Sequence, residues 1–393
     1  MSFLNELLGW INDPFGRIQD WLAGRLAGFL PPWGVDLVMI ALTIVALLAF
    51  LVVVVMYLTY LERKILGRIA DRPGPNRVGP LGLLQPIADV LKLIVKEVIR
   101  PAQADLAVYI LAPVVVVAPA ILVYAVLPIG PRMVPVDINV GVLFVVSVSS
   151  LATLALLMAG WGSGNKYSLL GGMRAVAQMV SYEIPLVLAF LGVVLLTGSL
   201  SLVEITKAQA AYPFVLAQPL GFLIALICAV AEVNRSPFDI PEAESELVAG
   251  YHVEYGGVGF AMFFLAEYIE MFTVSALLTV LFLGGWQGPI LPPYLWFLIK
   301  VYAILILMFW LRGTFPRLRV DQLMNLSWKF LLPLSMVNVV VVALVDKLGL
   351  PGGFLPSLLA SLVVMAAAGG AAWAQRHRRV GVAVRPGWQA REA

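Results

Sequence analysis

Long apolar runs separated by short polar segments make up most of this chain. Runs such as Asp36–Leu61 and Val140–Ala159 hold about 20 mainly apolar residues, enough for an α-helix to cross the hydrocarbon core of a bilayer. Backbone polar groups in that core need partners within their own segment, so such runs are expected to be helical. We predict an all-α membrane protein of about nine transmembrane helices, near residues 36–61, 107–128, 138–160, 176–197, 213–234, 258–284, 294–312, 330–345 and 354–374.

Composition and charge agree with this pattern and orient it. The chain is 61% apolar and only 12% charged, whereas a soluble domain is about 45–50% apolar. When the connecting segments are assigned alternately to the two sides of the bilayer, one side receives most of the 26 basic residues. By the positive-inside rule that side is cytoplasmic, so we expect the N-terminus outside and the C-terminus inside. The exceptions are Arg17, Arg25, Arg132, Lys207, Lys300 and Lys347.

Cysteine and histidine are too scarce for a redox centre within the chain. An iron–sulfur cluster needs about four thiolates, and a bis-histidine haem needs two histidines inside the membrane. The chain has only Cys228, and its two histidines, His252 and His377, lie in polar segments. We therefore expect no covalently bound cofactor and no redox centre in this chain.

Residues 61–100 form the first segment with informative chemistry. Between Arg72 and Pro80, prolines and glycines exclude a helix and indicate a stiff loop. From Leu81 to Arg100, polar residues recur every three or four positions among apolar ones, which predicts an in-plane amphipathic helix at the membrane surface. A solvated helix face with snorkelling basic side chains would give the same pattern.

The second segment, residues 160–185, places a carboxylate at the membrane edge. Glu183 is expected just inside a span, two residues before Pro185. Charged groups inside a bilayer are costly and are by default candidates for function, such as proton exchange. The alternative is an interfacial glutamate paired with Arg174 or Lys166.

The third segment, residues 231–268, is the most acidic. Glu232 ends one span, and Glu267 and Glu270 lie three residues apart on one face of the next. Like charges this close cannot all be ionised cheaply, so we expect a coupled set that relays protons. A solvated acidic loop would explain Glu242 and Glu254 equally well, but not the intramembrane glutamates. The loop between these two spans contains one cation, Arg235, and the carboxylates of Asp239, Glu242, Glu244, Glu246 and Glu254.

The fourth segment, residues 312–329, is basic. It contains four cations, Arg312 among them, and a single carboxylate, that of Asp321. Such a cluster suits anionic lipid head groups, a partner subunit or the polar head of a ligand.

Together these segments resemble the NuoH-type membrane subunit of respiratory complex I, the proton-pumping NADH:quinone oxidoreductase. The resemblance covers about 300 residues, from the first predicted span to the eighth, a core longer than most single domains. Four long motifs carry it: ERKILGRIADRPGPNRVGPLGLLQPIADVLKL, GWGSGNKYSLLGGMRAVAQMVSYEIP, AEVNRSPFDIPEAESELVAGYHVEY and RGTFPRLRVDQLM.

The resemblance implies a location, partners and a substrate. Such subunits lie in the bacterial cell (inner) membrane and, with two peripheral subunits, enclose a cavity that admits ubiquinone or menaquinone from the lipid bilayer. The iron–sulfur clusters and FMN would lie only in partner subunits. Small membrane subunits and antiporter-like subunits would be further neighbours, and no nucleic-acid partner is expected.

The resemblance also implies roles for particular residues. The quinone-cavity candidates are Arg63, Arg72, Arg235, Phe238 and Arg312. The proton-coupling candidates are Glu183, Glu232, Asp239, Glu242, Glu244, Glu246 and Glu267. Some relatives carry a further carboxylate in the span before the GW motif, where this chain has Ser147, Ser149 and Ser150.

A division into three parts follows. Residues 1–35, with tryptophans among charges, are expected to be a retained interfacial segment; residues 36–346 the eight-helix core with cytoplasmic quinone-site loops; and residues 347–393 an extra transmembrane helix with a basic tail. Three alternatives remain open: the equivalent subunit of a membrane-bound hydrogenase, a stand-alone secondary transporter and a purely structural anchor.

Overall fold

The computed structural model describes residues 13–241, 248–348 and 354–382. These residues form helices and connecting loops, with no strand among them. In chain order the α-helices are α2 (Pro14–Leu26), α3 (Pro32–Ile69), α4 (Gln85–Val95), α5 (Leu106–Leu122), α6 (Gly141–Gly162), α7 (Lys166–Thr197), α8 (Leu202–Ala208), α9 (Phe214–Ala217), α10 (Pro219–Glu232), α12 (Gly257–Phe282), α13 (Pro293–Thr314), α14 (Val320–Leu326), α15 (Leu332–Leu348) and α16 (Leu355–Val382). Short 3-10 turns η1 (Pro80–Gly82), η2 (Val123–Ala125) and η3 (Gly250–His252) and a π-helical turn η4 (Ser327–Leu331) complete the set.

The predicted all-α membrane fold is confirmed. Seven helical stretches among the described residues are long and apolar enough to cross a bilayer, and each coincides with a predicted span. The expected spans at 213–234 and 354–374 coincide with shorter apolar helices, Pro219–Glu232 and Leu355–Gly370. The first is short because α9 ends at Ala217, the backbone of Gln218 is not helical, and Pro219 starts a new helix. The count of nine spans therefore stays a prediction.

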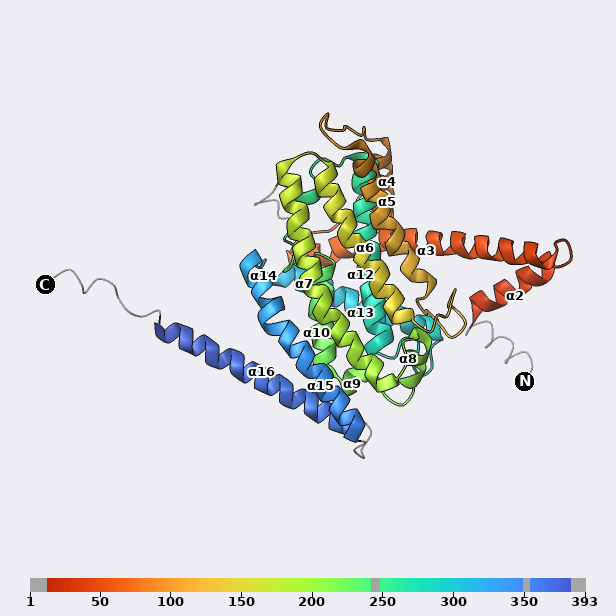
Figure 1. Cartoon of the computed structure of the whole chain (residues 1–393). Coiled ribbons are helices and arrows are strands. Elements are labelled where there is room, and N and C mark those ends of the chain that lie inside the picture. Colours follow the sequence, from red (N-terminus) through yellow and green to blue (C-terminus); the bar gives the residue numbers. More distant parts are fainter. Residues whose placement is uncertain (1–12, 242–247, 349–353, 383–393) are drawn as a thin grey trace.

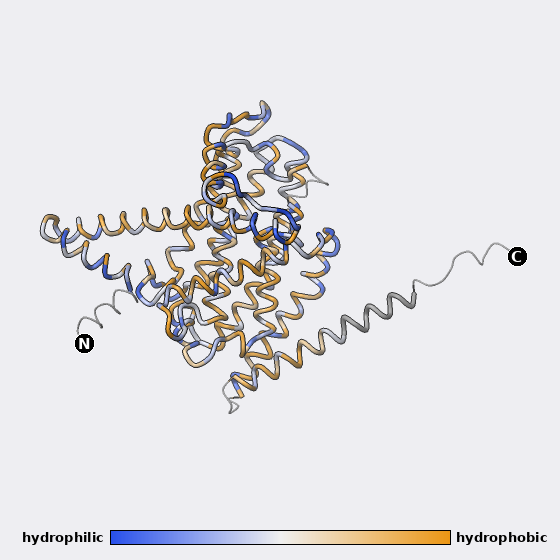
Figure 2. The backbone as a smooth tube through the Cα atoms, turned by 180° about the vertical axis from the view of Figure 1, so that it is seen from behind, coloured by the Kyte–Doolittle hydropathy of each residue, from blue (hydrophilic) through white to orange (hydrophobic). Residues whose placement is uncertain are grey.

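Helix α12 lies at the centre of the bundle. Most of its apolar window is buried, whereas most of the corresponding window of α3 is exposed. Helices α5, α3, α13 and α10 pack against α12, and α7 packs against α6, α10 and α15. Figure 1 shows the bundle helices side by side, with the N-terminal part of α3 and all of α2 projecting from it. Figure 2 shows that apolar segments follow the helices and that polar segments gather in the loops.

The loop after α3 folds back onto that helix. Tyr60 donates a hydrogen bond to the Leu81 carbonyl (2.9 Å), and Lys64 donates one to the Asn76 side chain (2.8 Å). Helix α4 then covers only the middle of the predicted amphipathic run, because Pro86 lies in its first turn and the backbone at Lys96 is extended. Its position in the membrane plane stays a prediction.

The N-terminal half of α7 holds the end of the acidic segment by close packing. A β-carbon on Gly171 would lie 2.6 Å from the backbone of Gly250, so only glycine allows η3 to approach this closely. Ser168 donates a hydrogen bond to the Tyr251 carbonyl (2.8 Å), and Asn165, which caps α7, donates one to Glu254 (2.6 Å). These contacts fix the segment that leads into α12.

The two ends of the chain contribute peripheral helices. Helix α2 is capped by Asp13, and Arg132 pairs with Asp13 (3.4 Å) and Asp20 (3.5 Å). Residues 1–12, including the first part of the predicted interfacial segment, lie outside the described residues. At the other end α16 packs against α15, α10 and α9. The proposed division into three parts stays a prediction.

Candidate functional site: an arginine cluster and a carboxylate pocket

Two arginines and two glutamates meet where α3, α12 and α13 approach the loop after α10; Arg235, Glu62 and Glu267 are buried and Arg312 is half-buried. Arg235 pairs with Glu62 (3.3 Å) and, through Nε, with Glu267 (3.0 Å), while Arg312 forms a second ion pair with Glu62. Tyr268 donates a 2.5 Å hydrogen bond to Glu62, and the Arg235 guanidinium lies 4.6 Å from the centre of the Tyr268 ring. We name these five residues the arginine cluster.

The arginine cluster is almost inaccessible to solvent at its centre. Glu62 is 2% exposed and Arg235 is 5% exposed. Taking charges out of water is costly unless each is paired with good geometry, and removing one partner leaves an uncompensated buried charge. Two cations and two anions balance here. The cluster is therefore a neutral but strongly polarised unit that responds to any new charge placed beside it.

The loop that carries Arg235 is held by the side chain of Gln178 on α7. Gln178 donates hydrogen bonds to the carbonyls of Ala231 (2.8 Å) and Phe238 (2.7 Å). The turn after α10 passes through Asn234 with a φ of 54°, a left-handed conformation that asparagine tolerates better than most residues. This turn directs Arg235 toward α3 and α12.

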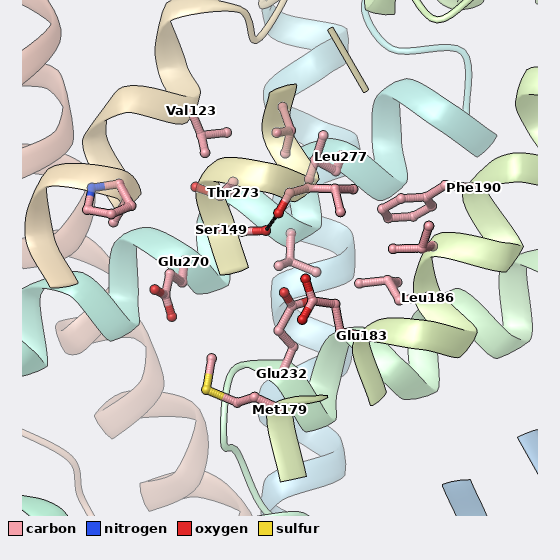
Figure 3. A pocket seen from close by; sticks show the side chains of 16 residues that line it. Val123, Ser149, Met179, Glu183, Leu186, Phe190, Glu232, Glu270, Thr273 and Leu277 are labelled. Atoms are coloured by element: carbon pink, nitrogen blue, oxygen red, sulfur yellow. Dashed lines mark hydrogen bonds between the residues drawn. The ribbon is translucent and has the colours of Figure 1, made fainter. Parts of the chain in front are cut away.

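A second site lies among α5, α6, α7, α10 and α12. It is a cavity of about 40 Å³, which has room for roughly three water molecules. Glu183, Glu232 and Glu270 line it, and Figure 3 shows the carboxylates of Glu183 and Glu232 close together with Glu270 on another wall. No basic side chain is among the described residues that line it. We name this cavity the carboxylate pocket; its other polar or sulfur-containing lining residues are Ser149, Met179 and Thr273.

The three glutamates differ from those of the arginine cluster because they lack cationic partners. Among the described residues none of the three forms an ion pair, and Glu232 Oε2 is buried without a hydrogen-bond partner. The alternative that Glu183 pairs with Arg174 or Lys166 is therefore not what the described residues show. Like charges without a counter-charge repel, so the pocket favours sharing protons over holding three negative charges.

A proline and a π-helical turn set the position of Glu183. Pro185 has no N–H, so the carbonyl of Ser181 loses its usual partner within α7. Ser327 donates a hydrogen bond to that carbonyl, and Trp328 donates one to the Ser181 hydroxyl (3.0 Å). Both donors belong to η4. A π-helical turn inserts an extra residue into a helix and is frequent at functional sites.

The structure brings several predicted site residues together. Arg235, Arg312 and Glu267 meet in the arginine cluster, and Glu183 and Glu232 meet in the carboxylate pocket. Glu267 and its near neighbour on α12 belong to different sites, since only Glu270 lines the pocket.

Other candidates lie elsewhere. Phe238 is buried beside the Tyr182 ring (5.4 Å between centroids), and Asp239 pairs with Arg317 (2.6 Å). Arg63 pairs with Asp89 (2.5 Å) near the surface, and Arg72 is exposed in the loop after α3. The candidates Glu242, Glu244 and Glu246 lie outside the described residues.

Sequence reasoning missed Glu62, although a signal for its burial was present. Leu51, Val55, Leu58 and Glu62 recur at intervals of three or four residues, and the first three are buried on one face of α3. Helical periodicity therefore places Glu62 on the buried face, while its neighbour Arg63 points away.

Comparison with known proteins assigns the family. A sequence model described as NADH dehydrogenase matches residues 42–343. The chain is 55% identical over 300 residues to the H subunit of NADH-quinone oxidoreductase from Dehalococcoides mccartyi strain CBDB1, covering 76% of this chain and 85% of that protein. It is 50% identical over 321 residues to the H subunit from Brevibacillus brevis, covering 80% and 95%. This chain belongs to the family of NADH-quinone oxidoreductase H subunits.

The H subunit from Geobacillus kaustophilus gives the same result, with 54% identity over 304 residues, 75% of this chain and 91% of that protein. The resemblance inferred from the four motifs is thus confirmed, and the chain is a membrane subunit of an NADH-quinone oxidoreductase, complex I. These names favour the quinone enzyme over the hydrogenase-type alternative. Both the arginine cluster and the carboxylate pocket lie within the residues matched by the family.

Proposed function

We propose that this membrane subunit forms part of the quinone cavity of complex I and couples quinone reduction to proton pumping through its two buried sites. The observation that carries the proposal is that α12 contributes one carboxylate to each site. Glu267 belongs to the arginine cluster, and Glu270, one turn further along, lines the carboxylate pocket. A change of charge at one site therefore acts over a short distance on the other.

The arginine cluster would be the sensor. Quinone reduction takes up electrons and protons, which changes the charge beside Arg235, Arg312 and the neighbouring Phe238. A charge that moves against a membrane potential of 100 mV costs about 2.3 kcal/mol. Redistribution of one charge among coupled carboxylates is thus large enough to drive a pumping step.

The surroundings follow from the family and the charge distribution. The chain would lie in the cytoplasmic membrane of a bacterium, with its N-terminus periplasmic and its C-terminus cytoplasmic. Peripheral subunits that carry iron–sulfur clusters and FMN would cover the cytoplasmic loops, and the substrate would be ubiquinone or menaquinone. Among the described residues no group of three histidine, cysteine or acidic side chains is placed to hold a metal ion.

A substitution that removes charge but keeps shape tests the proposal. In the assembled complex, Glu232→Gln should lower proton pumping and coupled quinone reduction by about tenfold or more, because a proton-transferring carboxylate is lost. The matched control is Glu204→Gln, which changes an exposed glutamate at the start of α8, outside both sites. Unchanged pumping and reductase rates in the Glu232 variant would overturn the proposed coupling role.

A further inference from the structure

Glu270 is the pocket glutamate to which the family resemblance assigns no role. It comes from α12, whereas Glu183 comes from α7 and Glu232 from the end of α10. Figure 3 shows Glu270 on a wall of the carboxylate pocket apart from the other two. Three helices thus direct one carboxylate each into a single small cavity.

The rest of the pocket offers few other groups that could take a proton. The walls formed by α5, η2 and α6 are Pro119, Ala120, Val123, Val145, Val146 and Ser149. Ser149 already donates its hydroxyl hydrogen to the Val146 carbonyl (3.0 Å), and Thr273 is hydrogen-bonded to Tyr124 (2.9 Å). Within the described lining, Glu270 on α12 is the one further carboxylate that can bind a proton released by Glu183 or Glu232.

The electrostatics of the pocket favour such an exchange. Glu232 interacts electrostatically with both Glu183 and Glu270, and no basic side chain lines the cavity within the described residues. The cavity also has room for roughly three water molecules, enough to connect carboxylates that do not touch. Glu232 Oε2, buried without a hydrogen-bond partner among the described residues, is one polar atom that such water would satisfy.

We propose that Glu270 is a third proton-carrying residue of this subunit and connects Glu232 with the α12 side of the carboxylate pocket. A proton leaves the Glu232 carboxyl, passes through water and binds the Glu270 carboxylate. Glu232 becomes ionised as Glu270 becomes neutral, so the total charge of the pocket is unchanged. The inference rests on the proposed coupling function and extends it to a residue and a direction.

The test moves the carboxylate across the pocket. In the intact complex in membrane vesicles, Glu270→Gln should lower NADH-driven proton pumping by about tenfold. Adding Ser149→Glu to this variant returns a carboxylate to the same cavity from α6 and should restore a large part of the loss. The matched control is Ser150→Glu in the same background, since Ser150 is adjacent on α6 but does not line the pocket. Electron transfer from NADH to a soluble acceptor that bypasses quinone checks that the complex is assembled.

The outcomes separate this inference from the function it extends. If Glu270→Gln pumps normally while Glu232→Gln does not, Glu270 carries no proton and the coupling function stands. If both pump normally, the coupling function itself fails. Equal rescue by Ser149→Glu and Ser150→Glu would also overturn the inference, since position in the pocket would then be irrelevant.

A measurement on the unsubstituted complex covers the case in which Glu270→Gln does not assemble. Hydrophobic carbodiimides react with protonated carboxyl groups in apolar surroundings, and mass spectrometry locates the modified residue. We expect a modified Glu270 together with loss of pumping. Full inhibition with an unmodified Glu270 would overturn the inference.

Discussion

The arginine cluster and the carboxylate pocket are both built from glutamates on and around α12, yet they differ in one respect. Glu62 and Glu267 have arginine partners, whereas Glu183, Glu232 and Glu270 have none among the described residues. Arginine does not lose its proton in proteins, so it balances a neighbouring carboxylate as a permanent charge. In the proposed mechanism, the glutamate side chain is thus a fixed charge in one site and a proton carrier in the other.

This difference suggests a division of labour within a short distance. A balanced ion cluster changes its field when a ligand alters its surroundings, but it does not itself exchange protons readily. A cavity of unpaired carboxylates with water exchanges protons, but needs an external field to give the exchange a direction. In the proposed mechanism, one site supplies the field and the other supplies the protons, and α12 joins them.

Removing the central cation should have the largest effect. Arg235→Met removes a cation that pairs with both Glu62 and Glu267, and loss of one partner from a buried ion pair costs about 3–5 kcal/mol. We expect little assembled complex on native gels and little quinone reductase activity in membranes. The matched control is Arg319→Met, because Arg319 pairs with Asp321 at 3.8 Å on the surface and such pairs contribute at most about 1 kcal/mol.

A compensating change shows whether charge balance is the cause. The double variant Arg235→Met with Glu267→Met removes one charge of each sign, and apolar replacement of a buried pair is often tolerated. It should assemble better than Arg235→Met alone. Equal loss in the single and double variants would mean that Arg235 acts through shape rather than charge.

Placing a cation in the carboxylate pocket should give its glutamates the kind of partner that those of the arginine cluster already have. Met179 lines the pocket and is buried, and a lysine there would pair with a nearby glutamate and hold its charge. We expect Met179→Lys to assemble but to lose pumping by about tenfold or more. Met173→Lys is the control, because Met173 lies on the same helix with its side chain exposed. Normal pumping in the Met179 variant would contradict the role assigned to unpaired carboxylates.

The sequence could predict the helices and the positions of the glutamates along them, because both depend on local pattern. Long apolar runs need internal backbone hydrogen bonds, and Glu183, Glu232 and Glu267 fall inside or at the ends of such runs. The burial of Glu62 was also accessible, through its spacing from Leu58 on the buried face of α3.

What the sequence could not give is the choice of partners. Glu267 and Glu270 share one helix face, and only the positions of Arg235 and of α7 decide that the first is ion-paired and the second lines a cavity. Those positions depend on the turn at Asn234 and on the hydrogen bonds of Gln178, which link residues more than 50 positions apart. The π-helical turn η4 likewise has no clear signature in composition.

Weakening the contact between η4 and α7 should lower stability and pumping less than the substitutions above. It tests whether the position of Glu183 matters for the carboxylate pocket. Trp328→Phe keeps an aromatic ring but removes the N–H that donates to the Ser181 hydroxyl, which we expect to cost about 1.5 kcal/mol. A lower thermal midpoint of the purified complex measures the loss. Pumping should fall more than quinone binding, because Glu183 lies two residues from Ser181. Trp310→Phe, at an exposed position on α13, is the control and should leave the midpoint unchanged.

The smallest expected effect concerns a titratable group outside both sites. His252 lies in η3 between the rings of Tyr251 and Phe260, and burial lowers its pKa from 6.5 to about 4, although the negative charge of Asp239 opposes this. When the loop opens, the imidazole regains its ordinary pKa and binds a proton between these two values. The packed loop is therefore fully stable well above pH 6.5 and loses stability as the pH falls, by about 1 kcal/mol at pH 6.

Hydrogen exchange of residues 250–256, corrected for intrinsic rates, measures this loss. Protection should decrease from pH 7.5 to pH 6 in the unsubstituted complex but stay constant in His252→Gln, which has no titrating group at this position. A parallel decrease in both would assign the change to another group and would mean that burial does not keep His252 neutral. The histidine thus tests, outside the membrane, the principle that separates the two glutamate sites: burial without a counter-charge favours the neutral form.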